Sequence, residues 1–222
     1  MTSPAHEIVA AMRTLDRKGL NRGASGNISL RCPDAGDSFW ITPSGIPATE
    51  LTVDDIVRVD GRSQVHGRWR ASSEWRFHRD VLAARADMSA LVHTHSIHAT
   101  AFAICRQPIP AAHYMVAAAG GAEIPCAGYA VFGSQALSES IVTALGARYQ
   151  ACLMANHGML AGGPSLARAL WLAEEVETLA HQYALACQIG RPAILDAAAM
   201  NAVQAGFAGY GPGSTTHAEP SE

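Results

Sequence analysis

Short apolar segments of strand length alternate with longer stretches of helical period, and this alternation constrains the fold of the chain most. ALVHTH (90–95) is followed by the helical pattern SIHATAFAI (96–104), and CLMANHGMLAGG (152–163), two strand segments around a turn, precedes an amphipathic helix from Ser165 to Gly190. Because a sheet must cover its apolar faces with other elements, this pattern predicts an α/β fold. We expect a three-layer α/β/α single domain with a central, mostly antiparallel sheet covered by helices.

Local signals predict the remaining elements. An N-terminal amphipathic helix is capped near Ser3-Pro4 and carries Ile8, Met12 and Leu15 on one face. The other predicted elements are strands near 28–30, 38–42 and 54–60, helices at 73–86 and 134–145, and a loop, a short helix and a strand within 109–126.

Composition favours a compact core over disorder, since 49% of the 222 residues are hydrophobic and 16% are charged. We expect one domain over residues 1–205 and a C-terminal tail over 206–222 that is partly flexible, because it is rich in Gly, Ser and Pro. The net charge is −3 and no basic run follows a phosphate backbone, so nucleic acid is not an expected partner.

Cysteine usage and the N-terminal segment predict a cytoplasmic protein. The five cysteines are odd in number and have no CxxC spacing, which argues against a disulfide framework or a structural zinc cluster. The N-terminal segment does not read as a signal peptide. No window approaches the roughly 18–20 unbroken apolar residues of a membrane span.

Three histidines and one glutamate form a candidate metal site. His93 and His95 lie two apart in a strand, so both side chains leave the same face, and His157 lies at a turn between two apolar strands. Each alone is more often a structural residue. Together with Glu74 they make three imidazoles and one carboxylate, a set that suits a borderline divalent ion such as zinc.

The other histidines carry weaker signals. His78 follows Glu74 by one helical turn, which puts it beside the site rather than among its ligands. His98 is off the strand face by the spacing rule, and His113 has no evident partner. The remaining histidines are expected at the surface: His6, His66, His181 and His217.

Small hydrogen-bond donors gather in three short clusters, Gly26-Asn27, Ser44-Gly45 and Ser72-Ser73. Backbone N–H groups at a helix N-terminus, with serine hydroxyls beside them, favour an anion. Any one cluster is more often a plain turn or helix cap. Three such clusters beside a metal set favour a small phosphorylated, oxygen-rich substrate.

At these residues the chain resembles the class II aldolase/adducin superfamily. The matching segments run in order from about residue 19 to residue 180: GLNRGASGNIS, ITPSGIP, SSEWRFH, the HTH pair, IPAAHYMVAAAGG, YAVFG, NHG and RALWLAEEVETLA. SSEWRFH and HYMVAAAGG are long enough to be specific, whereas NHG alone is weak.

The resemblance implies a homotetramer with active sites between subunits. It implies reversible cleavage of a ketose 1-phosphate, of the L-fuculose 1-phosphate type, to dihydroxyacetone phosphate and an aldehyde through a metal-held enediolate. The metal, one divalent ion per subunit, is expected to be Zn²⁺, with Mn²⁺ or Co²⁺ as alternatives. The chain has a single lysine, Lys18, in a polar helix-end setting, which disfavours a Schiff-base route.

The resemblance also assigns roles residue by residue. His93, His95, His157 and Glu74 are the metal ligands, and Glu74 is also the base. Tyr114 is the proton donor that reaches in from the neighbouring subunit. The substrate-binding residues are Asn27, Ser44, Gly45, Ser72 and Ser73 for the phosphate, and Phe132 and Tyr210 for the aldehyde end.

Other functions stay open within and beyond this superfamily. Aldolases for 5-deoxyribulose 1-phosphate or 5-methylthioribulose 1-phosphate use the same dihydroxyacetone phosphate half, and pentulose-phosphate epimerases and dehydratases share the metal histidines. Adducin-like domains that lost the metal serve as interaction modules, but this chain keeps all four expected ligands.

Overall fold

The computed structural model describes residues 3–33 and 35–207. Its main element is an eight-stranded sheet in the order β4-β3-β2-β1-β5-β10-β9-β8, and a small sheet pairs β6 with β7. The strands are β1 (Asn27–Arg31), β2 (Phe39–Ile41), β3 (Val57–Val59), β4 (Val65–His66), β5 (Ala90–Thr94), β6 (Ile109–Pro110), β7 (Glu123–Ile124), β8 (Cys126–Ala127), β9 (Ala151–Met154) and β10 (Gly158–Gly163).

The strands of the main sheet pair in antiparallel fashion, except that β8 runs parallel to β9. In the centre, β5 lies between β1 and β10, with Asn27 opposite His93 on one side and Leu160 opposite His93 on the other. The predicted mostly antiparallel sheet is therefore confirmed.

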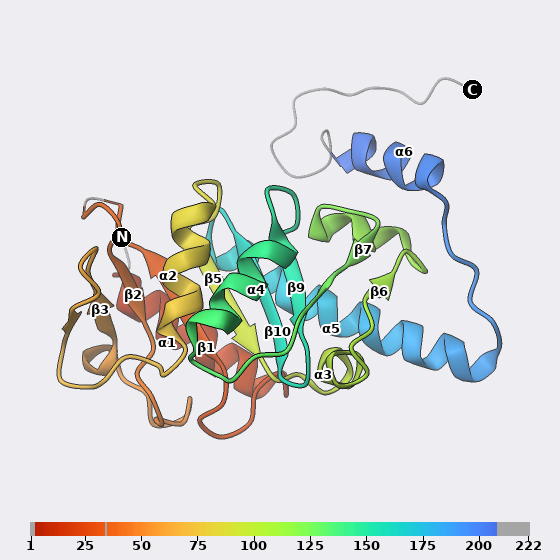
Figure 1. Cartoon of the computed structure of the whole chain (residues 1–222). Coiled ribbons are helices and arrows are strands. Elements are labelled where there is room, and N and C mark those ends of the chain that lie inside the picture. Colours follow the sequence, from red (N-terminus) through yellow and green to blue (C-terminus); the bar gives the residue numbers. More distant parts are fainter. Residues whose placement is uncertain (1–2, 34, 208–222) are drawn as a thin grey trace.

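Helices cover both faces of this sheet (Figure 1). They are α1 (Pro4–Arg17), α2 (Trp75–Ala84), α3 (Ile97–Ile104), α4 (Gln135–Leu145), α5 (Leu166–Ile189) and α6 (Ala197–Phe207), with short 3-10 helices η1 (Val53–Asp55) and η2 (Tyr114–Ala119). One hydrophobic core joins the sheet to α1, α3 and α5, and a second joins it to α2 and α4. The predicted three-layer α/β/α arrangement is confirmed.

The sequence signals explain α1 well. Ser3 is its N-cap and accepts a hydrogen bond from the backbone N–H of His6, and Pro4 occupies the first turn, where its missing N–H costs nothing. Ile8, Met12 and Leu15 are all buried against the sheet, as their spacing predicts.

Two predicted boundaries are wrong, and one helix was not predicted. The helix expected from Ser73 begins at Trp75, because Glu74 has non-helical backbone angles and is the N-cap. The first residues of the strand expected at 54–60 form η1 instead, since Asp55 bonds back to the N–H and hydroxyl of Thr52. The helix α6 was not predicted at all, because its alanine-rich sequence has little amphipathic pattern; beyond it, the predicted tail lies outside the described residues.

Among residues 3–33 and 35–207, no helix combines the length and the apolar character that crossing a membrane requires.

Candidate metal centre and active-site cavity

Two neighbouring strands and the start of one helix bring the four predicted ligands together. His93 lies on β5, His95 follows its end, and His157 lies in the turn that leads into β10. Glu74 caps α2, which packs over the same face of the sheet. Because β5 and β10 are paired and antiparallel, the C-terminal end of β5 lies beside the N-terminal end of β10. The N-cap of α2 supplies the Glu74 carboxylate to the same place.

The ligand atoms of these four residues all lie within 4.8 Å of one another. His93 Nε2 is 3.0 Å from His95 Nε2 and 3.2 Å from Glu74 Oε2, and His157 Nε2 is 3.0 Å from Glu74 Oε1. The three imidazole rings meet edge to face, with centroids 4.8–5.0 Å apart. The rings thus surround one point instead of stacking on one another.

One hydrogen bond determines which nitrogen of the His93 ring carries a proton. His93 Nδ1 lies 2.8 Å from the backbone oxygen of Met159, which can only accept, so Nδ1 carries the proton. In its neutral form the His93 ring therefore presents an unprotonated Nε2 toward Glu74 and His95, which is the form that binds a cation.

Burial and charge set the ionisation of the cluster at neutral pH. Burial by itself raises the pKa of Glu74, but the neighbouring His93 and His157 outweigh it and hold that pKa well below its usual range. Burial lowers the pKa of His95 to about 4, and the charges of His93 and His157 add to this effect. An ionised carboxylate therefore faces a neutral imidazole.

The residues present fit a divalent cation. Glu74 Oε1 is buried without a hydrogen-bond partner of good geometry, and His157 Nε2 lies 3.0 Å from it. Ligand atoms about 2.1 Å from one ion in a tetrahedral arrangement stand about 3.4 Å apart, close to the 3.0–3.2 Å separations found here. Three imidazole nitrogens and a carboxylate are a donor set for a borderline divalent ion.

The cluster forms one wall of a cavity of about 550 Å³, a volume that suits a small metabolite. Glu74, His95 and His157 line it on one side. The predicted substrate-binding residues that also line it are Asn27, Ser44, Gly45, Ser72, Ser73 and Phe132. Of the remaining predicted site residues, Tyr114 does not line this cavity, and Tyr210 lies outside the described residues.

Comparison with known proteins identifies the family. Residues 6–184 match the family described as Class II Aldolase and Adducin N-terminal domain. The chain belongs to the class II aldolase and adducin family.

Curated relatives in this family are named as aldolases. The chain is 47% identical over 206 residues to a 5-methylthioribulose-1-phosphate/5-deoxyribulose-1-phosphate aldolase of Rhodospirillum rubrum, covering 93% of this chain and 91% of the relative. It is 45% identical over 188 residues to the L-fuculose phosphate aldolase of Escherichia coli strain K12, covering 85% and 86%. A solved structure of an L-fuculose 1-phosphate aldolase superposes with a TM-score of 0.88 at 36% identity, covering 94% of this chain and 98% of that one. The chain is a class II aldolase.

At the start of α2, this class II aldolase has two serines in different environments. Ser72 is buried, and its Oγ accepts a hydrogen bond from the backbone N–H of Glu74 at 3.3 Å. Ser73 is exposed to the cavity. Capping therefore explains one hydrogen bond of the Ser72 hydroxyl, whereas the side chain of Ser73 is accessible to a ligand.

The side chain of Asn27 has partners that the sequence did not reveal. Its Nδ2 donates to Glu74 Oε2 at 2.9 Å, and its Oδ1 bonds with His78 Nε2. Asn27 lines the cavity as well, so one side chain contacts both the cavity and the Glu74 carboxylate.

Sequence reasoning missed three polar residues that line the cavity, Ser25, Tyr129 and Asn156. Asn156 Oδ1 accepts a hydrogen bond from Arg106 Nε at 2.9 Å, and the Arg106 guanidinium lies 5.9 Å from the Tyr129 ring centroid. The available signal was position: Asn156 directly precedes His157, and Tyr129 opens the segment YAVFG.

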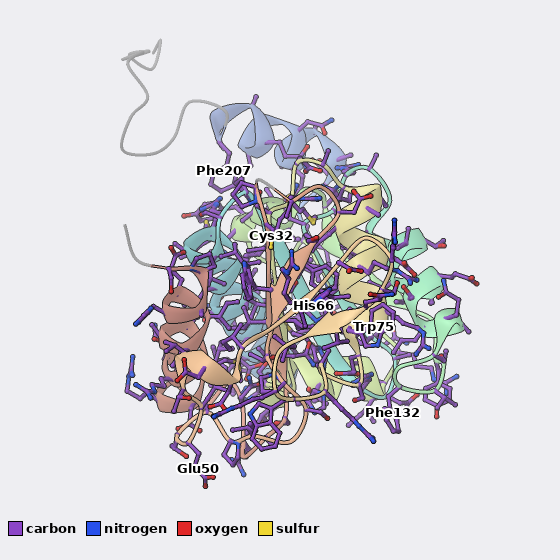
Figure 2. All side chains as sticks on the ribbon, turned by 90° about the vertical axis from the view of Figure 1, so that its left-hand side faces the viewer. Cys32, Glu50, His66, Trp75, Phe132 and Phe207 are labelled. Atoms are coloured by element: carbon purple, nitrogen blue, oxygen red, sulfur yellow. The ribbon has the colours of Figure 1, made fainter. Side chains whose placement is uncertain are left out.

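Tyr114 lies in η2 with half of its surface exposed. Its ring stacks on His113 and on Phe207 of α6, with centroids 4.8 Å and 6.5 Å apart. Figure 2 shows Phe207 near the top of the molecule and Phe132, at the cavity, near the bottom. Within a single chain of this aldolase, the Tyr114 region is therefore separate from the cavity.

Proposed function

We propose that the chain reversibly cleaves a ketose 1-phosphate of the L-fuculose 1-phosphate type to dihydroxyacetone phosphate and an aldehyde. The observation that carries this proposal is the cavity itself, where the Glu74 and histidine cluster faces the small donors at Ser44-Gly45 and Ser73. The relatives named as L-fuculose phosphate aldolases support the same substrate type.

A second substrate class has support of its own. The 47% identical relative is named for 5-methylthioribulose 1-phosphate and 5-deoxyribulose 1-phosphate. These ketoses share the dihydroxyacetone phosphate half and differ only in the aldehyde, so the same metal and phosphate residues serve both classes. The difference lies at the end of the cavity where Phe132 is exposed.

We assign the phosphate to the side of the cavity formed by Asn27, Ser44, Gly45, Ser72 and Ser73. The N-terminus of α2, the positive end of its helix dipole, begins directly after Ser73 and Glu74, which line the cavity. Gly45 has φ +78, a left-handed conformation that exposes the backbone of the turn and that a side chain would strain. The serine hydroxyls add further donors to an anion.

Glu74, His93, His95 and His157 would hold the metal ion, which we assign as Zn²⁺, with Mn²⁺ and Co²⁺ as alternatives. When bound, the ion supplies positive charge that stabilises the negative charge developing on the substrate carbonyl as the carbon–carbon bond breaks or forms. The single lysine, Lys18, is ion-paired with Glu174 at 2.6 Å near the surface, which is consistent with a route without a Schiff base.

Glu74 is the base in this proposal. In the condensation direction its ionised carboxylate takes the proton from the carbon beside the carbonyl, and in cleavage it returns that proton to carbon. Tyr114 protonates the newly formed alkoxide in condensation and accepts the hydroxyl proton in cleavage.

Because Tyr114 does not line the cavity of its own chain, we propose that it acts in the cavity of a neighbouring copy. The proposed assembly is a homotetramer with active sites at the subunit interfaces. Large apolar side chains are exposed around and near the cavity, as expected of surfaces that a neighbour covers: Ile97, Ile104, Tyr129, Val131 and Phe132. The described cysteines are free thiols, in line with a cytoplasmic enzyme.

A product screen tests this function. The purified, metal-loaded protein is incubated with dihydroxyacetone phosphate and lactaldehyde, acetaldehyde, methylthioacetaldehyde or glycolaldehyde, and kcat/KM is ranked. We expect lactaldehyde to rank first, whereas a preference for methylthioacetaldehyde or acetaldehyde would assign the second substrate class. Interconversion of pentulose phosphates without dihydroxyacetone phosphate release would instead indicate an epimerase.

A further inference from the structure

A buried row of three polar side chains lies behind Glu74. Asn27 Nδ2 donates to Glu74 Oε2 at 2.9 Å, His78 Nε2 bonds with Asn27 Oδ1, and Ser29 Oγ lies 2.7 Å from His78 Nδ1. Ser29 and His78 have no exposed surface. Neither of them lines the cavity, so both act, if at all, through Asn27.

The direction of every hydrogen bond in this row follows from its acceptors. The Glu74 carboxylate can only accept, so the amide of Asn27 must turn Nδ2 toward it and Oδ1 toward His78. Oδ1 can also only accept, so His78 donates from Nε2. Burial lowers the pKa of His78 to about 3, so the ring is neutral and its Nδ1 accepts from the hydroxyl of Ser29.

Reversing the amide would break this row in two places. Asn27 Oδ1 would face the Glu74 carboxylate, which is a repulsive contact between two acceptors. Its NH₂ group would face the N–H of His78, which leaves two donors opposed. The N–H of His78 therefore reinforces the amide orientation that the Glu74 carboxylate requires.

The spacing of the two elements explains why these residues meet. Asn27 and Ser29 leave the same face of β1, about 6.7 Å apart along the strand. Glu74 and His78 lie about 6 Å apart along α2, one turn from each other. The two spacings match, so the helix sets its carboxylate beside Asn27 and its imidazole between Asn27 and Ser29.

We propose that His78 is a positioning residue for the metal site: through Asn27 it fixes the Glu74 carboxylate in the orientation that receives the ion. Oε2 is held by Asn27, and Oε1 is the oxygen without a hydrogen-bond partner of good geometry. Groups that orient a metal ligand from behind typically contribute about 10–100-fold to metal affinity. This inference rests on the proposed metal role of the cluster.

Metal affinity tests the inference without any assay of turnover. The dissociation constant for Zn²⁺ is measured by competition with a chromophoric chelator in wild type, His78→Leu and His78→Gln. We expect His78→Leu to weaken binding about 10-fold or more. His78→Gln, whose amide N–H can reach the position of Nε2, should stay within about 3-fold of wild type.

Val81→Ala is the matched control. Val81 lies on α2 and is fully buried in the same core, but it does not belong to the row of hydrogen bonds. It should lower stability and leave the dissociation constant unchanged. If Val81→Ala weakens binding as much as His78→Leu, or if the leucine and glutamine variants are equally affected, His78 is only a packing residue and the inference is wrong.

Ser29→Ala provides a second test, which decides the question if His78→Leu does not fold. It removes only the hydroxyl that donates to His78 Nδ1, and we expect severalfold weaker Zn²⁺ binding; an unchanged constant would reject the inference. Wild type that binds Zn²⁺ but releases no dihydroxyacetone phosphate would contradict the proposed function and leave the affinity test intact.

Discussion

Gly158 packs directly against the backbone oxygen of Thr94, in the space between His93 and His95. A Cβ at Gly158 would overlap that oxygen and would come within 2.9 Å of the His95 ring. The clashing atom belongs to the backbone, so it cannot move away by a side-chain rotation. A larger residue at position 158 must therefore separate β5 from β10.

Gly158→Ala should therefore weaken Zn²⁺ binding about 10-fold or more, because it displaces His95 from the cluster. Gly162→Ala, on the same strand, is the control, since its Cβ would meet mainly the flexible end of Met88. Both variants should unfold at lower temperature, but only Gly158→Ala should show the affinity loss in a chelator competition. Equal affinities in the two variants would contradict this account of the site.

His95→Ala should remove both the metal and the activity. The imidazole is one of three in the cluster, and the alanine variant leaves two nitrogens and a carboxylate in a cavity open to water. Elemental analysis after dialysis should find well under one ion per chain. His66→Ala is the control, because His66 is exposed and pairs with Asp60 away from the cavity. A fully loaded His95→Ala protein would exclude His95 as a ligand.

Tyr114→Phe should keep the metal and lose most of its turnover. Loss of a general acid typically lowers kcat about 100-fold or more, and the phenylalanine ring preserves the stacking on Phe207. Tyr149→Phe, which packs in the core between the sheet and α4, should retain activity and serves as control. Wild-type kcat in Tyr114→Phe would reject it as the proton donor.

Ser72→Ala should act mainly on substrate binding. Its Oγ accepts from the N–H of Glu74, and a hydroxyl that accepts one hydrogen bond can still donate another to a phosphate. A hydrogen bond to a charged group contributes about 1.5–3 kcal/mol, so we expect KM to rise about 10-fold or more with a smaller change in kcat. Ser165→Ala removes the N-cap of α5 instead and should leave KM unchanged. A normal KM in Ser72→Ala would remove this residue from the phosphate site.

The buried His78 should make the metal-free protein sensitive to acid. Its folded pKa is about 3, whereas an imidazole in the unfolded chain titrates near about 6.5. Between these values the unfolded state binds the extra proton, so the free energy of unfolding falls as pH falls, by up to about 1.4 kcal/mol per pH unit.

Urea unfolding of wild type and His78→Gln between pH 4.5 and 7, with chelator present, measures this effect. His95 titrates in both proteins, so its contribution cancels in the difference. We expect the glutamine variant to lose part of the pH dependence, and identical slopes would contradict a buried neutral His78.

Periodicity was enough to predict the layers of the fold and most of its helices. The burial of Ile8, Met12 and Leu15 follows directly from their spacing, and the strand pair around His157 follows from two apolar runs with a turn between them. The helix α6 was missed because alanine-rich sequence buries little and shows no clear face; Met200 is its buried residue.

The candidate site was likewise predictable only in part from the sequence. Residue type and strand spacing indicated that His93 and His95 share a face, but which distant segments meet them depends on the pairing of β5 with β1 and β10. The link from Asn27 to His78 could not be predicted, because it depends on how α2 crosses β1. Asn156 was missed because a single amide before a histidine carries no pattern.

The pairing of β1, β5 and β10 also has a consequence for how the protein matures. Glu74, His93 and His157 are far apart along the chain and become neighbours only when α2 docks on a completed central sheet. Such long-range contacts form late, after the entropy of closing large loops has been overcome. A cation can therefore contact all four groups at once only after the central sheet has paired and α2 has packed on it.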